Sequence, residues 1–315
     1  MSTSGVYTFS RNRDQLITDA LLLANIIDED ETPSSSMMDK ANASLNAMVK
    51  HWQGTGVYIW TMAEATLFLQ KTQTSYTLSS TSSDHATESF TETTLSAAAA
   101  SGASTFTVTS ATGLVAAQYL GIELDSGSWQ FTTISSVVST TVTPAAVLTG
   151  AAASGNRVIA YTTKIVRPLE ITAARRYNFD SAIDTPIDVE DRETYFDEPN
   201  KTNSGTVNLI FYDRRGGANA TGILRTWQSP STIDDAIKFT WKRPIQDFSV
   251  AADDPDLPQE WIETIVYNLG ARLALSYGNA TRLQLIGPMA KQNLDEMRWN
   301  EKELGTVSFA PDMRR

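Results

Sequence analysis

Near its N-terminus, the chain places apolar side chains at the spacing of two α-helices. Asn12 and Gln15 stand where the two side chains of a capping box would lie, and serines 34–36 supply N-caps for a second helix. Acidic residues 28–31 and then Pro33 separate the two, because proline cannot continue a helical hydrogen-bond ladder. The stripes are Leu16, Ile17, Ala20, Leu21, Leu23, Ala24 and Ile27, then Met37, Met38, Ala41, Leu45, Met48, Val49 and Trp52. This spacing predicts an antiparallel helix pair whose apolar stripes need a further partner.

The C-terminal region predicts two more helices. Pro255 and Pro258 introduce a stripe that Gly278 ends. Its members are Ile262, Ile265, Val266, Leu269, Leu273 and Tyr277. A last helix is predicted over 281–304, kinked or restarted at Gly287-Pro288. Its inward-facing residues are expected to be Leu285, Met289, Leu294 and Met297.

Between these regions the apolar positions follow the period of β-strands. Strands are predicted at 57–60, 66–69, 75–78, 207–212, 222–227 and 236–241. From Thr72 to Thr163, Ser, Thr, Ala and Gly dominate, and Arg157 is the one basic residue. Short strands there are marked by Phe106, Val108, Tyr119, Ile122, Leu124, Trp129, Phe131, Ile134, Val158 and Tyr161. Residues 90–163 are therefore predicted to form a domain rather than a flexible linker.

Together these elements predict an α+β fold. The expected architecture is a helical bundle formed from the N- and C-terminal helices, with an inserted β-rich region that includes a small β-sandwich or barrel domain. The predicted domains are a core of residues 1–80 and 165–315, with the bundle and a β layer, and an inserted β-domain at 85–164.

Composition narrows the chemistry that the chain can perform. The absence of Cys excludes disulfides and thiolate metal ligands, and His51 and His85 lack metal-ligand spacing. A net charge of −11 opposes tight binding to phosphate backbones. No stretch approaches the ~18 apolar residues of a membrane span, and the first residues lack a basic segment followed by an apolar run. The chain is expected to be made in the cytoplasm and to bind no membrane.

The familiar catalytic signatures do not occur in the sequence. It contains no Gly-x-Ser-x-Gly elbow, His-Glu-x-x-His helix or phosphate-binding loop, so we predict that the chain is not an enzyme and uses no cofactor or metal. Glu260 and Glu263 leave a virion-associated peptidoglycan hydrolase as an alternative, although a solvated helix face is favoured. The acidic residues 253, 254 and 256 could form a Ca²⁺ site, but the favoured interpretation is that they shape a loop that leads into a helix.

Two aromatic residues support a third alternative. Trp129 and Tyr119 lie in the predicted β-domain, and rings of this kind can stack on the face of a sugar. A carbohydrate-binding tail module is the corresponding function.

Two groups of residues resemble a known family. The first group is Leu16-Ile17-Thr18-Asp19-Ala20-Leu21, Glu31-Thr32-Pro33, the run from Leu45 to Trp52, and residues 56–60. The second is Arg167-Pro168-Leu169-Glu170-Ile171, Tyr195 with Pro199-Asn200-Lys201, and Phe211-Tyr212-Asp213 before a strand that ends in Trp227. They resemble the head-to-tail adaptor, or tail accessory factor, family of short-tailed (podovirus-type) bacteriophages. The central segment departs from the shorter members of that family.

The resemblance implies a structural virion protein at the head-tail junction, assembled in the host cytoplasm. Members form a homo-oligomeric ring, usually of about twelve copies, that docks under the portal protein and extends the DNA channel. DNA would pass through the lumen without sequence-specific binding. The ring would offer an attachment platform to downstream tail, nozzle or fibre proteins.

An interface with the portal or with a neighbouring copy is expected at the terminal helices and tail and at paired arginines. The candidates are Met297, Trp299, Phe309, Met313, Arg314, Arg315, Arg175 and Arg176. Because the net charge is negative, the paired arginines are expected to meet acidic patches on a neighbour rather than DNA.

Overall fold

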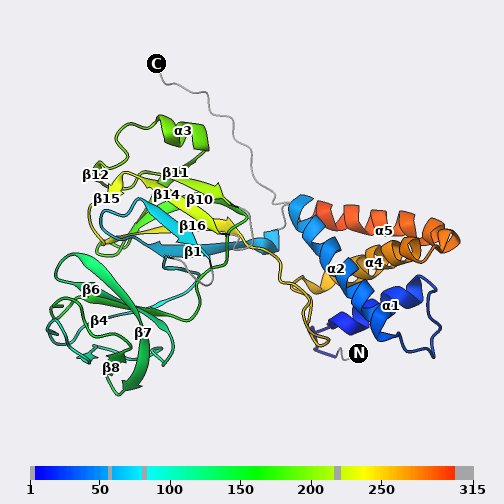
Figure 1. Ribbon diagram of the computed structural model, residues 1–315, viewed down its shortest axis with the longest axis horizontal. Helices are drawn as coiled ribbons and strands as arrows, with labels where there is room; N and C mark the ends of the chain where they lie inside the picture. The colour runs from blue at the N-terminus through cyan, green and yellow to red at the C-terminus, as the bar shows by residue number, and fades with distance from the viewer. Residues whose placement is uncertain (1–3, 56–58, 80–83, 216–220, 302–315) are drawn as a thin grey trace. The chain divides into compact units, whose positions relative to one another are not determined.

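The chain folds into two compact units. The computed structural model describes residues 4–55, 59–79, 84–215 and 221–301 (Figure 1). A helical unit is built from Met1–Thr61 and Ile245–Arg315, and a β unit from Met62–Pro244. The chain therefore leaves the helical unit once and returns to it once.

The prediction of a helical bundle with an inserted β-rich region is wrong. The structure is mostly β, with large, nearly closed, barrel-like sheets, and its five helices make up 28% of it. Two long strands, β10 (Glu170–Asn178) and β11 (Ile183–Glu190), were not predicted from the sequence. Few of their residues are buried, so no alternating pattern of apolar and polar residues results. Pro186 also argued against a strand at β11. It is tolerated because it pairs with β10 alone, since the pairing of β11 with β13 begins only at Asp188.

Helices from both ends of the chain share one apolar core in the helical unit. They are α1 (Arg13–Leu23), α2 (Ser35–Thr55), α4 (Ile262–Ser276) and α5 (Ala280–Asn300). The predicted capping box is confirmed, since Asn12 and Gln15 each accept a hydrogen bond from the backbone N–H of the other. The rings of Trp52 and Trp261 lie 5.7 Å apart in the core. Helix α5 runs through Pro288 without the predicted restart.

A close contact joins α1 to α4. A Cβ on Gly270 would lie only 3.2 Å from the side chain of Leu23 and 3.3 Å from a backbone oxygen of α1, so the glycine allows the two helices to approach. The last carbonyls of α1 have no partner within their own helix. The side chain of Asn279 donates to the carbonyl of Ala24 (3.1 Å), and Arg282 donates to that of Leu23 (2.6 Å). The start of α5 thus completes the end of α1.

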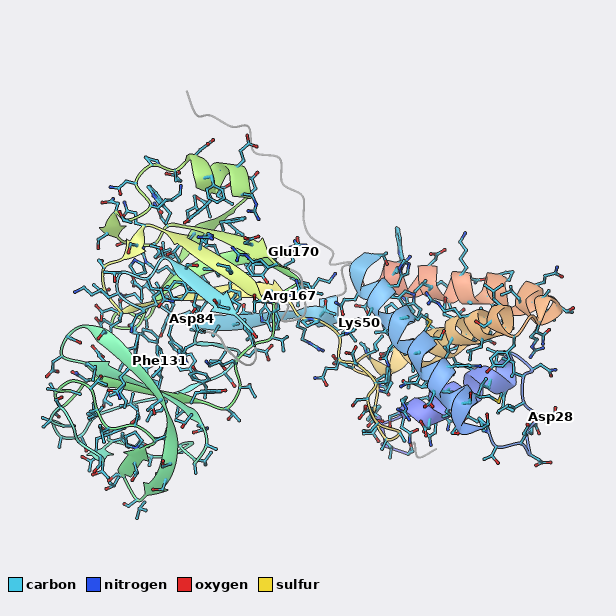
Figure 2. All side chains as sticks on the ribbon, in the orientation of Figure 1. Asp28, Lys50, Asp84, Phe131, Arg167 and Glu170 are labelled. Atoms are coloured by element: carbon cyan, nitrogen blue, oxygen red, sulfur yellow. The ribbon has the colours of Figure 1, made fainter. Side chains whose placement is uncertain are left out.

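Helix α2 holds the segment through which the chain returns from the β unit. The side-chain amide of Asn46 makes two hydrogen bonds with the backbone of Phe248, one as donor (3.0 Å) and one as acceptor (2.9 Å). Lys50, labelled in Figure 2, donates to the carbonyl of Ile245 (2.5 Å) and pairs with Asp247 (2.8 Å). These bonds satisfy backbone groups that no regular element pairs.

An eight-stranded sheet in the β unit has the order β2-β14-β13-β11-β10-β16-β1-β3. Its remaining strands are β1 (Met62–Phe68), β2 (Ser75–Leu78), β3 (Ala86–Thr87), β13 (Leu209–Arg214), β14 (Gly222–Trp227) and β16 (Asp235–Lys242). The predicted strand at 57–60 is not formed where it is described, since Ile59–Thr61 is a 3-10 helix. Strands β1 and β16 are antiparallel neighbours, and Met62 lies opposite Lys242. The first and last strands of the β unit therefore begin and end side by side.

Smaller elements complete this part of the chain. They are α3 (Arg192–Asp197), with Asp191 as its N-cap, and a two-stranded pair of β12 (Ser204–Gly205) and β15 (Ser229–Pro230). The pKa of the Asp191 carboxyl lies below its usual value because the backbone N–H of Thr194 donates to it.

A six-stranded sheet lies within the predicted insertion and has its own apolar core. Its order is β4-β9-β6-β7-β8-β5. The strands are β4 (Thr91–Thr94), β5 (Phe106–Thr107), β6 (Tyr119–Leu124), β7 (Ser128–Val138), β8 (Thr141–Pro144) and β9 (Arg157–Tyr161). At Gly121 on β6, a Cβ would approach Ile159 and Phe131 to within 2.8 Å, so only glycine fits there. The boundaries predicted for the insertion, 85–164, enclose all six strands but stay a prediction.

An aromatic cluster joins the two sheets of the β unit. Phe68 of β1 stacks on Tyr161 of β9 at 5.9 Å and on Phe179 at 6.3 Å. His85 lies against Phe131 with ring centroids 3.5 Å apart and shares a hydrogen bond with the hydroxyl of Tyr161. Burial lowers the pKa of His85 from 6.5 to about 3, and the nearby charge of Lys164 adds to the effect. The imidazole is therefore neutral at physiological pH.

Arg157 forms an ionic contact beside this cluster. Its side chain is largely buried and lies 3.5 Å from Glu92 and 3.8 Å from Glu123, both on the six-stranded sheet. It also pairs with Asp180, which follows β10, and with Asp234 (3.7 Å), which precedes β16. The one basic residue of the 72–163 stretch therefore binds carboxylates from both sheets.

Two neighbouring residues of α5 test how the helical core is built. We expect Ile286→Ala to lower the free energy of unfolding by about 2 to 5 kcal/mol, because Ile286 is only 3% exposed and its loss leaves a cavity. The matched variant Leu285→Ala, at a position 61% exposed, is expected to change it by less than about 0.5 kcal/mol. Urea denaturation followed by circular dichroism measures both; equal effects would contradict this orientation of α5.

Acid should weaken the β unit through His85. The unfolded chain takes up a proton on this side chain near pH 6.5, whereas the folded chain does so only near pH 3, so this contribution to stability is present above pH 6.5 and declines between those values. The decline should be at most about 1.4 kcal/mol per pH unit. Melting curves of the protein and of His85→Gln should therefore show a shallower pH dependence for the variant over this window. Parallel pH profiles would refute the role assigned to His85.

Candidate functional site

Helix α5 has two apolar faces. Ile286 and Ala290 are buried on the inner face, and Leu294 and Met297 pack partly against the same core. The outer face comprises Leu285, Pro288, Met289, Gln292, Glu296 and Trp299. These positions are three or four residues apart, so they lie along one side of the helix. Leu285 is 61% exposed, Met289 48% and Trp299 72%, which leaves a large apolar area in water.

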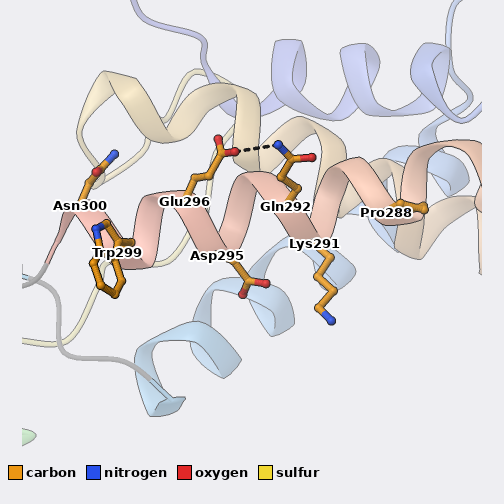
Figure 3. A pocket seen from close by; sticks show the side chains of 7 residues that line it. All are labelled: Pro288, Lys291, Gln292, Asp295, Glu296, Trp299 and Asn300. Carbon is orange, nitrogen blue, oxygen red and sulfur yellow. Dashed lines mark hydrogen bonds between the residues drawn. The ribbon is translucent and has the colours of Figure 1, made fainter.

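The C-terminal half of the outer face borders a shallow hollow of about 740 Å³ (Figure 3). It is lined by Pro288, Lys291, Gln292, Asp295, Glu296, Trp299 and Asn300. Gln292 donates a hydrogen bond to Glu296 (2.7 Å), which holds both side chains along the helix. Two carboxylates, Asp295 and Glu296, give this end of α5 an acidic character.

A second hollow, the α4–α5 groove, lies between the two helices. Its volume is about 360 Å³, and it is lined mainly by the apolar residues Ala271, Leu275, Leu283, Ala290 and Leu294, together with Gly287, Asn268, Arg272 and Lys291. Asn268 donates to the carbonyl of Ala290 (2.9 Å) and ties the two helices together beside the groove. Leu275 is 68% exposed at its rim.

The groove has a basic edge. Arg272 is partly buried, and that burial lowers the pKa of its guanidinium from the ordinary value. Lys291 is exposed and borders both hollows. The two hollows differ in charge, since the first is lined by two carboxylates and the shared Lys291, whereas the groove is lined by Arg272 and Lys291 without a carboxylate.

The structure brings together two of the predicted interface residues and separates others from them. Met297 and Trp299 both lie on α5, but Met297 is half-buried against the core while Trp299 is exposed. Phe309, Met313, Arg314 and Arg315 lie outside the described residues.

Arg175 and Arg176 belong to the β unit. Arg175 pairs with Glu64 (2.7 Å), and Arg176 pairs with Asp235 (3.5 Å). Acids of the same chain therefore already occupy these guanidinium groups, and their role toward another protein stays a prediction.

The residues of the hydrolase alternative form no enclosed site. Glu260 lies in the 3-10 helix Gln259–Trp261, and Glu263 lies in the first turn of α4. Both are exposed, and neither lines either hollow. A carboxylate in a first helical turn is stabilised by the helix dipole, which accounts for the position of Glu263.

The acidic residues 253, 254 and 256 shape the loop that leads into α4. Asp253 accepts hydrogen bonds from the backbone N–H groups of Ser249 (2.6 Å) and Val250 (2.7 Å), which lower the pKa of its carboxyl. Asp256 accepts one from Gln246 (3.0 Å). Within the described part of the chain, no three His, Cys, Asp or Glu side chains are grouped so that they could hold a metal ion.

The aromatic pair of the sugar-binding alternative belongs to the cluster between the two sheets. Trp129 is buried in the cluster between the two sheets, where its ring lies 6.1 Å from Phe131. Tyr119 stacks on Tyr161 at 5.3 Å. Trp129 therefore presents no open face of the kind that sugar stacking needs, and Tyr119 is half-buried.

No protein-family model matches this chain, and no curated protein matches it in sequence. Among the described residues, none of the helices combines the length and the apolar character of a membrane span. What α4 and α5 can do is therefore inferred from their own side chains.

Sequence reasoning missed the outer face because two stripes interleave on α5. Leu285 and Met289 were predicted to face inward, and the structure exposes both. Ile286 and Ala290, one position later, take the inner places. The two registers differ by one residue, and the choice between them depends on how α4 packs rather than on α5 alone.

Fluorescence quenching can test the exposure of Trp299. We expect Trp299→Phe to remove much of the iodide-quenchable tryptophan emission, because Trp52, Trp129, Trp241 and Trp261 are buried. The control Trp227→Phe removes a half-buried ring whose Nε1 donates to Pro199 (3.1 Å), and it should remove less. A larger effect at position 227 would show that α5 is packed differently.

Proposed function

We propose that this chain is a structural subunit of a phage head-to-tail adaptor ring and not an enzyme. Several copies would dock under the portal, extend the DNA channel and offer a platform to the next tail component. The residues that resemble the adaptor family motivate this assignment, and the exposed surface of the helical unit supports it.

The observation that carries the proposal is the outer face of α5. A helix that already buries one side in its core has little reason to expose Leu285 and Met289 to water unless another surface covers them. Full burial of one such side chain is worth roughly 1.5 to 3 kcal/mol, as an upper estimate. Two of them would contribute a few kcal/mol to a contact with another subunit of the assembly, enough for a specific interface when many copies act together.

The charge of the chain supports a role around DNA rather than on it. Lys and Arg are outnumbered by Asp and Glu, 25 to 36. A channel lined by such subunits repels phosphates, so a duplex could slide through it without being held.

Portal loading tests the proposal directly. Purified chain mixed with portal rings of the phage that encodes it should add several copies per ring, measured by light scattering and counted by electron microscopy. Met289→Glu should lower the copy number at least tenfold at a fixed concentration, because a charge would then have to be buried in the contact. Val147→Glu, at an apolar position of the β unit with similar exposure (52% against 48% for Met289), is the control and should load normally. Failure of the unmodified chain to bind the rings would refute the function.

A further inference from the structure

We propose that the outer face of α5 in one copy docks into the α4–α5 groove of the next copy. The inference rests on the proposed function and names the contact by which copies would join. Its partner is a second copy of this chain, since both surfaces belong to the same helical unit.

The two surfaces are matched in their apolar character. Gly287 contributes no side chain to the groove, and the nearest atom to a Cβ placed there would be 3.8 Å away, on Leu283. The groove is therefore open in the middle. The outer face exposes large apolar side chains, Leu285 and Met289, of the kind that fill such a space.

Charge complementarity favours a second copy over an unrelated apolar partner. The groove is lined by Arg272 and Lys291 and by no carboxylate. The hollow of the outer face shares Lys291, but its two carboxylates, Asp295 and Glu296, outnumber that cation. Burial is the one cause that lowers the pKa of Arg272, so a carboxylate brought in by a neighbour would offset the cost of desolvating its guanidinium. A contact between two identical patches would bring like charges together, and this repulsion disfavours it relative to a contact between the outer face and the groove.

The positions of the two surfaces on α5 determine the kind of assembly. Trp299 lies twelve residues beyond Gly287, which is about 18 Å along a helix. The two surfaces also lie on different sides of α5, because the groove side faces α4 while the outer face points away from the core. A contact between two different patches is heterologous, and such a contact closes into a ring when the rotation between neighbours allows it.

Reciprocal charge reversal tests the contact. The outer-face variant combines Asp295→Lys with Glu296→Lys, and the groove variant combines Arg272→Glu with Lys291→Glu. Sedimentation velocity measures self-association in solution, and electron microscopy counts the copies loaded on portal rings. The control, Glu193→Lys with Asp197→Lys on α3, changes the net charge by the same amount as the outer-face variant, and thermal melting checks that each variant is folded.

We expect each reversed variant alone to associate at least tenfold more weakly than the unmodified chain, while the control is unaffected. An equimolar mixture of the two variants, or one chain that carries all four changes, should recover association because the opposite charges meet again. Two results would overturn the contact: variants that load on the portal as well as the unmodified chain, which leaves the adaptor function intact, or an unmodified chain that forms no contact between copies in either assay. If the chain did not bind portal rings but still self-associated in a way that the charge reversals weaken, the adaptor function alone would be refuted.

Discussion

The contact between α1 and α4 constrains the whole chain, because it makes the two ends of the sequence share one core. Gly270 permits the approach, and Asn279 and Arg282 complete the carbonyls at the end of α1. Everything between Thr61 and Ile245 must then depart from and return to the same helical unit. The pairing of Met62 with Lys242 meets this requirement, since the first and last strands of the β unit are antiparallel neighbours. A β fold with distant ends would strain the helical core.

Local signals in the sequence predicted the elements that depend on local chemistry. Helix caps and periodic burial depend on residues that are close together in the sequence. This is why the sequence predicted the Asn12 capping box, the four long helices and the strands at 75–78, 222–227 and 236–241. The overall fold class was wrong because β10 and β11 are stabilised by pairing with their neighbours rather than by a buried stripe. In the same way, packing against α4 decides which stripe of α5 faces the core. Of the outer face of α5, only Trp299 was therefore among the predicted interface residues, and Met297 packs against the core.

The two apolar sides of α5 separate the folding of the single chain from its assembly with other subunits. The inner side of α5 stabilises the single chain, whereas Leu285 and Met289 on the outer side are exposed in the part of the chain that the structure describes. Under the proposed function this separation is useful, because a subunit can fold first and assemble later without unfolding any part of its core. The same separation accounts for Asp295 and Glu296 beside the apolar residues, since exposed charges reduce non-specific association of an apolar helix face before assembly.

The ionic contacts of Arg157 limit how the inserted β-domain can be exchanged during evolution. Its guanidinium depends on Glu92 and Glu123 from one sheet and on Asp180 and Asp234 from the other. A recombination event that replaced residues 85–164 with a foreign β-domain would remove the arginine and leave Asp180 and Asp234 without this cation. An incoming domain that carried a basic residue at the same junction would restore the contact, so exchanges of that kind disturb the neighbouring sheet least.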